Sequence, residues 1–93
     1  MFKKFDEQKP RLELIEPEFI IGIGKIMTLG AEKYGDDNWK SAKPEDIKRL
    51  RGALLRHQMA YLGGERLDAE SGLSHLYHIG CNLMFLDYFD RRA

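Results

Sequence analysis

The chain has 93 residues, of which 43% are hydrophobic and 32% charged, and its 15 basic and 15 acidic side chains give a formal net charge of zero. This composition is typical of a soluble globular protein and excludes a disordered chain. The neutral balance provides no long-range attraction to nucleic acid or to an anionic membrane, and no apolar run is long enough to span a bilayer. A single cysteine, Cys81, excludes an intrachain disulfide and a zinc site built from cysteines.

We expect one domain over residues 1–93, because the chain is too short for two. A domain of this size buries only about 60–65% of the surface of its unfolded chain. Its core is therefore small, and we expect a homodimer or homotetramer to complete the bundle. Residues 1–16 are predicted to form a structured leader with a flexible start at residues 1–10. Lys9-Pro10-Arg11 is expected to be extended, because Pro10 disfavours helix at the residue before it.

Helix signals predict a first helix that opens at Pro17. Glu18 suits the positive end of the helix dipole, and apolar residues at helical spacing continue the pattern to about residue 32 or 33. Gly22 and Gly24 lie inside this helix and lower its intrinsic propensity. We expect them to allow the close approach of a neighbouring helix.

Two further helices follow. Pro44 begins the second, which is predicted to end at the Gly63-Gly64 pair. A serine hydroxyl, from Ser71 or Ser74, is expected to cap the start of the third. No segment shows the two-residue alternation of a strand, so the predicted fold class is all-α: a small bundle of three main helices behind a structured leader.

All three histidines lie in the second and third predicted helices. His57 occupies a position in the apolar stripe of its helix, while His75 and His78 share a helix face that Asn82 continues. Burial of four polar groups is costly unless each has a partner. The cluster therefore predicts either a polar pocket for a metal ion or phosphate, or a set of hydrogen-bonded core side chains.

Carboxylates are concentrated in the connection between these two helices. Glu65 and Asp68 are three residues apart, Glu70 follows, and Glu32 lies at the end of the first helix. Carboxylate oxygens suit Mg²⁺ or Mn²⁺, especially when a phosphate substrate supplies further oxygens. The alternative is that these side chains are solvated and bind nothing.

A polar turn after the first helix contains Lys33, Asn38 and Trp39, the only tryptophan. A lysine can contact phosphate, an amide can hydrogen-bond a nucleobase edge, and an indole ring can stack on a base. Trp39 can equally be a loop anchor whose ring covers the core.

The second helix is basic. Lys48, Arg49 and Arg51 predict a DNA-binding face as one alternative, although the neutral net charge favours a solvated surface. Arg56, farther along, is a candidate for bidentate contact with phosphate.

Several motifs occur together in a specific order. In sequence they are Lys9-Pro10-Arg11, Gly30-Ala31-Glu32-Lys33-Tyr34-Gly35, Asn38-Trp39, Leu55-Arg56-His57, Gly64-Glu65, Asp68, Glu70-Ser71-Gly72, and His75-x-x-His78-x-x-x-Asn82. This ordered set resembles the phage-associated dATP/dGTP diphosphohydrolase N-terminal domain over residues 9–87. That domain is in turn similar to the all-α MazG-like nucleoside triphosphate pyrophosphohydrolases.

The resemblance implies an oligomeric enzyme that hydrolyses a (deoxy)purine nucleoside triphosphate between its α and β phosphates. The products would be a monophosphate and pyrophosphate, and the cofactor Mg²⁺ or Mn²⁺. It also implies the cytoplasm of a bacterium or a phage-infected cell, with a nucleoside triphosphate as partner and neither a membrane nor nucleic acid.

Carried onto this sequence, the resemblance gives each candidate residue a role. The expected catalytic residues are Glu65, Asp68 and His78; the expected metal ligands are Glu32, Glu65, Asp68 and Glu70; and the expected substrate-binding residues are Lys33, Asn38, Trp39, Arg56, His57, His75 and Asn82. The wider superfamily carries a Glu-x-x-Glu pair on a core helix, whereas here the only such pair precedes the first helix. Either the metal site is built from other residues, or the domain binds nucleotides without hydrolysing them.

Overall fold

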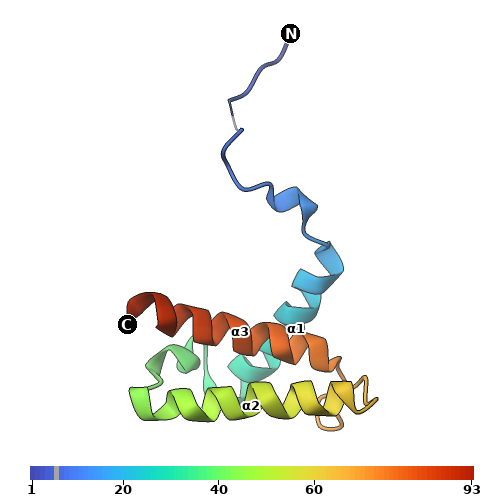
Figure 1. The fold of residues 1–93 in the computed structure, drawn as a ribbon, viewed down its shortest axis with the longest axis vertical. Coiled ribbons are helices and arrows are strands. Elements are labelled where there is room, and N and C mark those ends of the chain that lie inside the picture. Colours follow the sequence, from blue (N-terminus) through green and yellow to red (C-terminus); the bar gives the residue numbers. More distant parts are fainter. Residues whose placement is uncertain (6) are drawn as a thin grey trace.

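The structure is a computed structural model that describes residues 1–5 and 7–93. In chain order its elements are the short 3-10 helix η1 (Leu12–Leu14), α1 (Pro17–Tyr34), the short 3-10 helix η2 (Asn38–Ser41), α2 (Pro44–Leu62) and α3 (His75–Arg92) (Figure 1). Within the described residues there is no strand, only an isolated antiparallel bridge between Leu67 and Ser74. The predicted all-α fold with three main helices is confirmed.

The helix ends follow local signals in the sequence. Pro17 and Pro44 lie in the first turns of α1 and α2, as predicted. Ser74 caps α3, because its side-chain oxygen accepts a hydrogen bond from the backbone N–H of Leu76 at 3.1 Å. α1 ends at Gly35, whose φ of 94° is a conformation that favours glycine, and α2 ends at Gly63.

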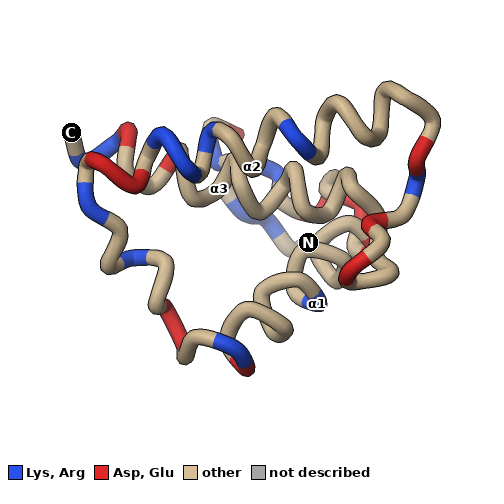
Figure 2. The backbone as a smooth tube through the Cα atoms, turned by 90° about the horizontal axis from the view of Figure 1, so that it is seen from below, with Lys and Arg blue, Asp and Glu red and all other residues tan. Residues whose placement is uncertain are grey.

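α2 and α3 run antiparallel and side by side, joined by the loop of residues 63–74, and α3 also packs on α1 (Figure 1). The first two-thirds of α3 contains no Lys, Arg, Asp or Glu. In Figure 2 the charged residues of α3 are accordingly gathered near its C-terminal end. The uncharged part of α3 is therefore the part that lies between the other two helices.

α3 turns a partly polar stripe toward the other helices. His75, Cys81 and Asn82 are the buried residues of this helix. By contrast, Leu83, in the neighbouring apolar stripe, leaves 52% of its surface exposed, and Leu76 is exposed as well. The polar groups of α3 are thus inside the bundle, while part of its apolar surface is outside.

Small residues allow α1 and α3 to approach closely. A Cβ atom on Gly22 would lie 2.5 Å from ring atoms of Tyr77 on α3. Gly80 on α3 in turn faces Ile23, where a Cβ would meet side-chain atoms at 3.1 Å. The expected close approach is confirmed for Gly22 and wrong for Gly24, which has open space around it.

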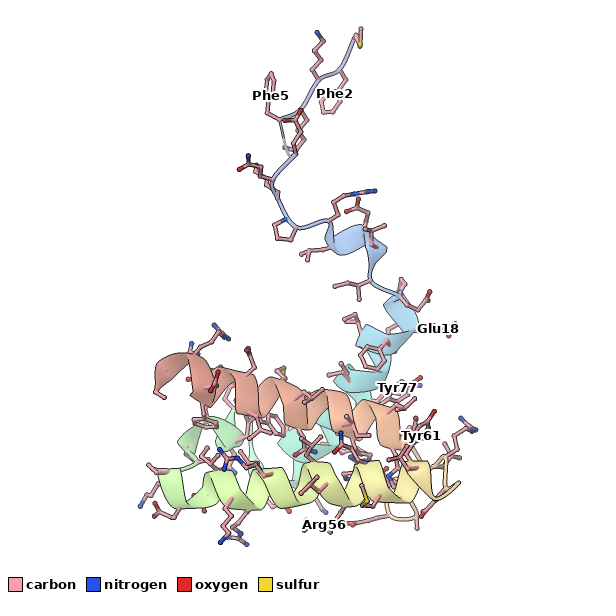
Figure 3. All side chains as sticks on the ribbon, viewed as in Figure 1. Phe2, Phe5, Glu18, Arg56, Tyr61 and Tyr77 are labelled. Atoms are coloured by element: carbon pink, nitrogen blue, oxygen red, sulfur yellow. The ribbon has the colours of Figure 1, made fainter. Side chains whose placement is uncertain are left out.

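The leader extends away from the helices (Figure 1). Its one regular element is η1, and both Leu12 and Leu14 are exposed. Phe2 and Phe5 lie far from the bundle (Figure 3). The structured part of the leader is therefore a single turn that does not pack on the helices. None of the described helices combines the length and hydropathy needed to cross a bilayer.

Candidate functional site

Three side chains of the types that can ligate a metal ion converge from three different elements. His57 Nδ1 on α2 lies 2.8 Å from His75 Nδ1 on α3 and 4.0 Å from Asp68 Oδ1 in the connecting loop. One donor atom from each of these residues lies within 4.8 Å of the other two. We call His57, Asp68 and His75 the donor cluster. Its spacing is small enough for a single ion to contact all three.

The loop of residues 63–74 brings Asp68 to the two helices. The backbone N–H of Asp68 donates to the carbonyl of Leu73 at 2.8 Å, and the N–H of Gly72 donates back to the carbonyl of Asp68 at 2.8 Å. A further backbone bond at 3.0 Å joins the N–H of His75 to the carbonyl of Arg66. Gly72 adopts a φ of 73°, a conformation that glycine adopts easily and that allows the chain to turn back toward α3.

Ser71 holds the Asp68 carboxylate by one of its oxygens. The backbone N–H of Ser71 donates to Asp68 Oδ2 at 2.8 Å, and the Ser71 hydroxyl lies 2.8 Å from His78 Nε2. His78 Nε2 is itself 3.8 Å from Asp68 Oδ2. The other oxygen, Oδ1, is the one that faces His57. The sequence offers Ser71 as one of two candidate caps for the third helix, but Ser74 caps that helix and Ser71 instead closes the turn around Asp68.

Burial favours the neutral form of His57 and of His78. Burial is the main cause that lowers the pKa of His57, and the nearby His78 lowers it further against the opposing effect of Asp68. Burial also lowers the pKa of His78, again against Asp68. A neutral imidazole has a free nitrogen lone pair, which is the form that binds metal ions.

The Asp68 carboxyl is ionised at neutral pH. Its partial burial acts to raise its pKa, but hydrogen bonds from the backbone and hydroxyl of Ser71, together with the His78 and His57 rings, lower the pKa below its ordinary value. An anionic oxygen therefore faces the neutral imidazole of His57. This pairing of charge states suits a divalent cation.

His75 and Asn82 differ in how their polar atoms are used. His75 is only 3% exposed, and its Nε2 makes no hydrogen bond; the nearest carboxylate oxygen is Glu65 Oε1 at 3.5 Å, outside hydrogen-bond geometry. Asn82 instead donates from its side chain to the carbonyl of His78 at 2.9 Å. The Asn82 amide is thus hydrogen-bonded within α3, whereas the Nε2 atom of His75 has no hydrogen-bond partner.

A cavity of about 810 Å³ opens in front of the donor cluster. Of the residues expected to form the site, these line it: Glu32, Lys33, Arg56, His57, Glu65, Asp68, Glu70, His75 and His78. Lys33 on α1 pairs with Glu70 in the loop at 3.2 Å, and both side chains are exposed. The Glu70 carboxylate is the main cause that raises the pKa of Lys33. α1, α2, α3 and the loop therefore line one open cavity that contains these charged and imidazole side chains.

Asn38 and Trp39 line a different cavity, of about 580 Å³, beside the C-terminal half of α1. The Trp39 ring packs on Phe85 and Tyr88 of α3, with centroid distances of 4.7 and 4.9 Å. It thus covers part of the bundle, as the anchor interpretation expects. Tyr34 is among the few residues that line both cavities, so the two spaces adjoin along α1.

The fold and the site define a small helical protein with a cluster of histidine and carboxylate side chains in an open cavity. Residues 2–93 match the family described as "dATP/dGTP diphosphohydrolase, N-terminal", and the chain belongs to this family. A "dATP/dGTP diphosphohydrolase" of Salmonella phage PMBT28 is 37% identical to it over 83 residues, which are 89% of this chain and 28% of that protein. The chain therefore spans less than a third of the length of this relative. No solved structure is significantly similar to the chain.

Proposed function

We propose that this chain forms a metal-dependent site that hydrolyses (deoxy)purine nucleoside triphosphates between the α and β phosphates, releasing a monophosphate and pyrophosphate. The observation that carries this proposal is the convergence of His57, Asp68 and His75 in a cavity that also contains the cationic side chains Lys33 and Arg56. The name of the phage relative supports the substrate class and the bond cleaved.

The residues present fit a divalent cation. The donor cluster offers an ionised carboxylate from Asp68, the neutral imidazole of His57, and the Nδ1 atom of the buried His75. When bound there, such an ion neutralises phosphate charge and acidifies a coordinated water. Of the expected metal ligands, Asp68 belongs to the donor cluster, whereas Glu32, Glu65 and Glu70 line the cavity outside it.

The cationic side chains account for phosphate binding. Arg56 can contact phosphate oxygens through two N–H groups at once. Lys33 is paired with Glu70 only at an exposed position, so a polyphosphate can replace that carboxylate at little cost. We therefore assign both residues to the phosphate chain of the substrate.

We assign the proton acceptor for the attacking water to Glu65. One of its oxygens faces His75 at 3.5 Å, and its side chain is half exposed to the cavity, which leaves the second oxygen for water. His78, which is hydrogen-bonded to Ser71, acts as a positioning residue that fixes the Asp68 carboxylate.

The test is direct product analysis. The chain is incubated with each common ribo- and deoxynucleoside triphosphate, with Mg²⁺ and separately with Mn²⁺, and the products are separated by ion exchange. We expect monophosphate and pyrophosphate from purine deoxynucleotides, loss of activity in Asp68→Asn, and full activity in Asp90→Asn, an exposed acidic residue outside the cavity. Intact triphosphates under every condition, or full activity in Asp68→Asn, would contradict the proposal.

A nucleotide-binding module without catalysis is the second candidate. It is favoured by the small number of carboxylates in the donor cluster, where only Asp68 is acidic, and by the position of Glu13 and Glu16 at the exposed end of the leader. This candidate predicts that purine nucleotides raise the thermal midpoint of the protein and are recovered intact. Measured turnover would remove it.

We also propose that the chain forms a homodimer or homotetramer. Among the described residues Cys81 is the only buried hydrophobic side chain, so a single copy has little core. Large apolar side chains are exposed on η1 and on the adjoining part of α1, including Leu12, Leu14, Ile20 and Ile21. A second copy of the chain would cover them.

A further inference from the structure

The donor cluster is richer in imidazole nitrogen than in carboxylate oxygen. Two of its three members are histidines, and their Nδ1 atoms are the closest pair of donors, 2.8 Å apart. Mg²⁺ prefers oxygen ligands in octahedral geometry and keeps several waters, whereas imidazole suits Zn²⁺, Fe²⁺, Ni²⁺ and Cu²⁺. The chemistry of the donors therefore differs from that of a carboxylate-built magnesium site.

The spacing of the donors is close to that of ligands on one ion. Two nitrogens bound to the same tetrahedral Zn²⁺ at about 2.0–2.1 Å each lie about 3.3–3.4 Å apart. The His57 and His75 Nδ1 atoms are hydrogen-bonded to each other at 2.8 Å, so an ion between them would replace this hydrogen bond and move the rings about 0.5 Å apart. Asp68 Oδ1, 4.0 Å from His57 Nδ1, is slightly farther away, on the side of the carboxylate that Ser71 leaves free.

The two ring nitrogens of His75 have different surroundings: Nδ1 contacts His57 Nδ1 at 2.8 Å, and Nε2 faces Glu65. More than nine-tenths of this residue is buried, it lines the cavity, and its Nε2 has no hydrogen-bond partner. A histidine that only fills the core is normally hydrogen-bonded at its buried nitrogens. If Nδ1 binds an ion, Nε2 carries the proton and faces Glu65 at 3.5 Å, which is the usual arrangement of a metal-bound histidine with an outer carboxylate.

The remaining carboxylates of the cavity are used differently. Glu70 pairs with Lys33 at 3.2 Å, and Glu32 is exposed on α1. Among these carboxylates, Asp68 is fixed by Ser71, whose backbone N–H donates a hydrogen bond to Asp68 Oδ2 at 2.8 Å. Glu65 lies 3.5 Å from His75 Nε2, so the donor cluster has one fixed carboxylate beside the imidazoles of His57 and His75.

We infer that His57, His75 and Asp68 together bind one transition-metal ion of the Zn²⁺ type in preference to Mg²⁺. This inference deepens the proposed function, on which it rests for the role of the ion in hydrolysis, because it names the ion class of the same site. The binding itself depends only on the geometry of the three side chains.

The test uses Co²⁺ as a spectroscopic probe of metal binding without nucleotide. The full chain is stripped with chelator and titrated with Co²⁺, and visible d–d absorption is recorded. We expect saturation at one ion per chain, displacement of Co²⁺ by Zn²⁺, and no displacement by a large molar excess of Mg²⁺. Absence of a saturable spectrum, or equal displacement by Mg²⁺, would overturn the inference.

Variants connect the spectrum to the named residues. His57→Gln and Asp68→Asn are each expected to weaken Co²⁺ binding by at least about 10-fold. Asp90→Asn, on the far part of α3, keeps the affinity of the unmodified chain. Circular dichroism confirms that each variant is folded, and His57→Gln, at a less buried position than His75, avoids the deepest part of the site. Unchanged affinity in folded His57→Gln would overturn the inference.

The outcome separates this inference from the proposed function. Tight Co²⁺ and Zn²⁺ binding without nucleotide turnover supports the metal site and removes the catalytic proposal. Turnover with Mg²⁺ in a chain that does not bind Co²⁺ or Zn²⁺ supports catalysis and removes the inference.

Discussion

The imidazole ring of His57 lies flat on that of His78, with ring centroids 4.3 Å apart and an angle of 6° between the planes. The two rings come from α2 and α3, so this contact joins the helices at the site. His75 and Arg56 also face His57 and, like His78, oppose its protonation, whereas Asp68 favours it. Positive charge on either stacked ring is therefore unfavourable in the folded protein.

This relationship predicts that acid destabilises the metal-free protein. Burial is the first cause that lowers the pKa of both His57 and His78 in the folded state below the ordinary value of 6.5. The folded state thus binds fewer protons than the unfolded state. The two histidines therefore do not reduce the free energy of unfolding above pH 6.5, and they lower it increasingly as the pH drops below that value.

The measurement is the thermal midpoint in chelator from about pH 8 to about pH 5. We expect a decline that begins near the ordinary histidine pKa and is smaller in His78→Gln. A midpoint that rises on acidification over this range would show that the rings gain protons on folding.

Ser71→Ala tests whether the Ser71 hydroxyl helps to position the Asp68 carboxylate through His78. The change removes the hydroxyl that lies 2.8 Å from His78 Nε2 but keeps the backbone N–H that holds Asp68. We expect about 10-fold weaker Co²⁺ binding and a loss of about 1 kcal/mol in the free energy of unfolding. Ser41→Ala is the matched control, because its hydroxyl bonds the carbonyl of Asn38 away from the site. Equal effects of both substitutions on Co²⁺ binding would argue against a role for Ser71.

Gly22→Ala and Gly24→Ala form a second matched pair. The methyl group at Gly22 would meet the Tyr77 ring, so we expect a loss of about 1–3 kcal/mol in the free energy of unfolding. At Gly24 the methyl group enters open space, and the higher helix propensity of alanine is expected to add about 0.5–1 kcal/mol. Urea titrations of both variants give the two values, and the same sign in both would contradict the packing of α1 on α3.

The Cys81 thiol is expected to be unreactive in the folded protein. It is 1% exposed, contacts the carbonyl of Ile23 at 3.6 Å, and burial raises its pKa to about 11. Since the thiolate is the reactive form, a disulfide reagent at neutral pH should modify the folded chain far more slowly than the chain in denaturant. Rapid modification without denaturant would show that α1 and α3 separate readily.

Self-association is tested by light scattering. We expect the mass of a dimer or tetramer, and a shift toward the monomer in Ile21→Glu, which places a charge on the exposed apolar part of α1. Leu62→Glu, at an exposed position on the C-terminal end of α2, is the control and should keep the mass of the unmodified chain. A monomer mass for the unmodified chain would rule out the proposed oligomer.

Local signals explain why the helices could be predicted. Pro17, Pro44 and Ser74 act on the few residues next to them, so the sequence alone predicts where the helices begin. The buried face of α3 could not be predicted in the same way. Its apolar stripe and its histidine stripe have the same spacing, and only the neighbours across the bundle decide that His75 is inside and Leu83 outside.

The site could be predicted in composition but not in arrangement. The sequence indicates the histidines and Asp68, which do come together. It cannot tell which carboxylate of the loop reaches them, because that depends on the turn that Ser71 closes around Asp68. The contacts of Trp39 could not be predicted either, because its aromatic neighbours lie on α3, far along the chain.

The turn that carries Asp68 is closed by its own backbone, and the Leu67–Ser74 bridge ties it to the start of α3. The conformational entropy of this segment is therefore lost when the chain folds, not when a ligand arrives. An arriving ion meets donors that are already ordered. By mass action its binding then stabilises the entire hairpin of α2, loop and α3, so the hairpin unfolds less often as the site becomes occupied.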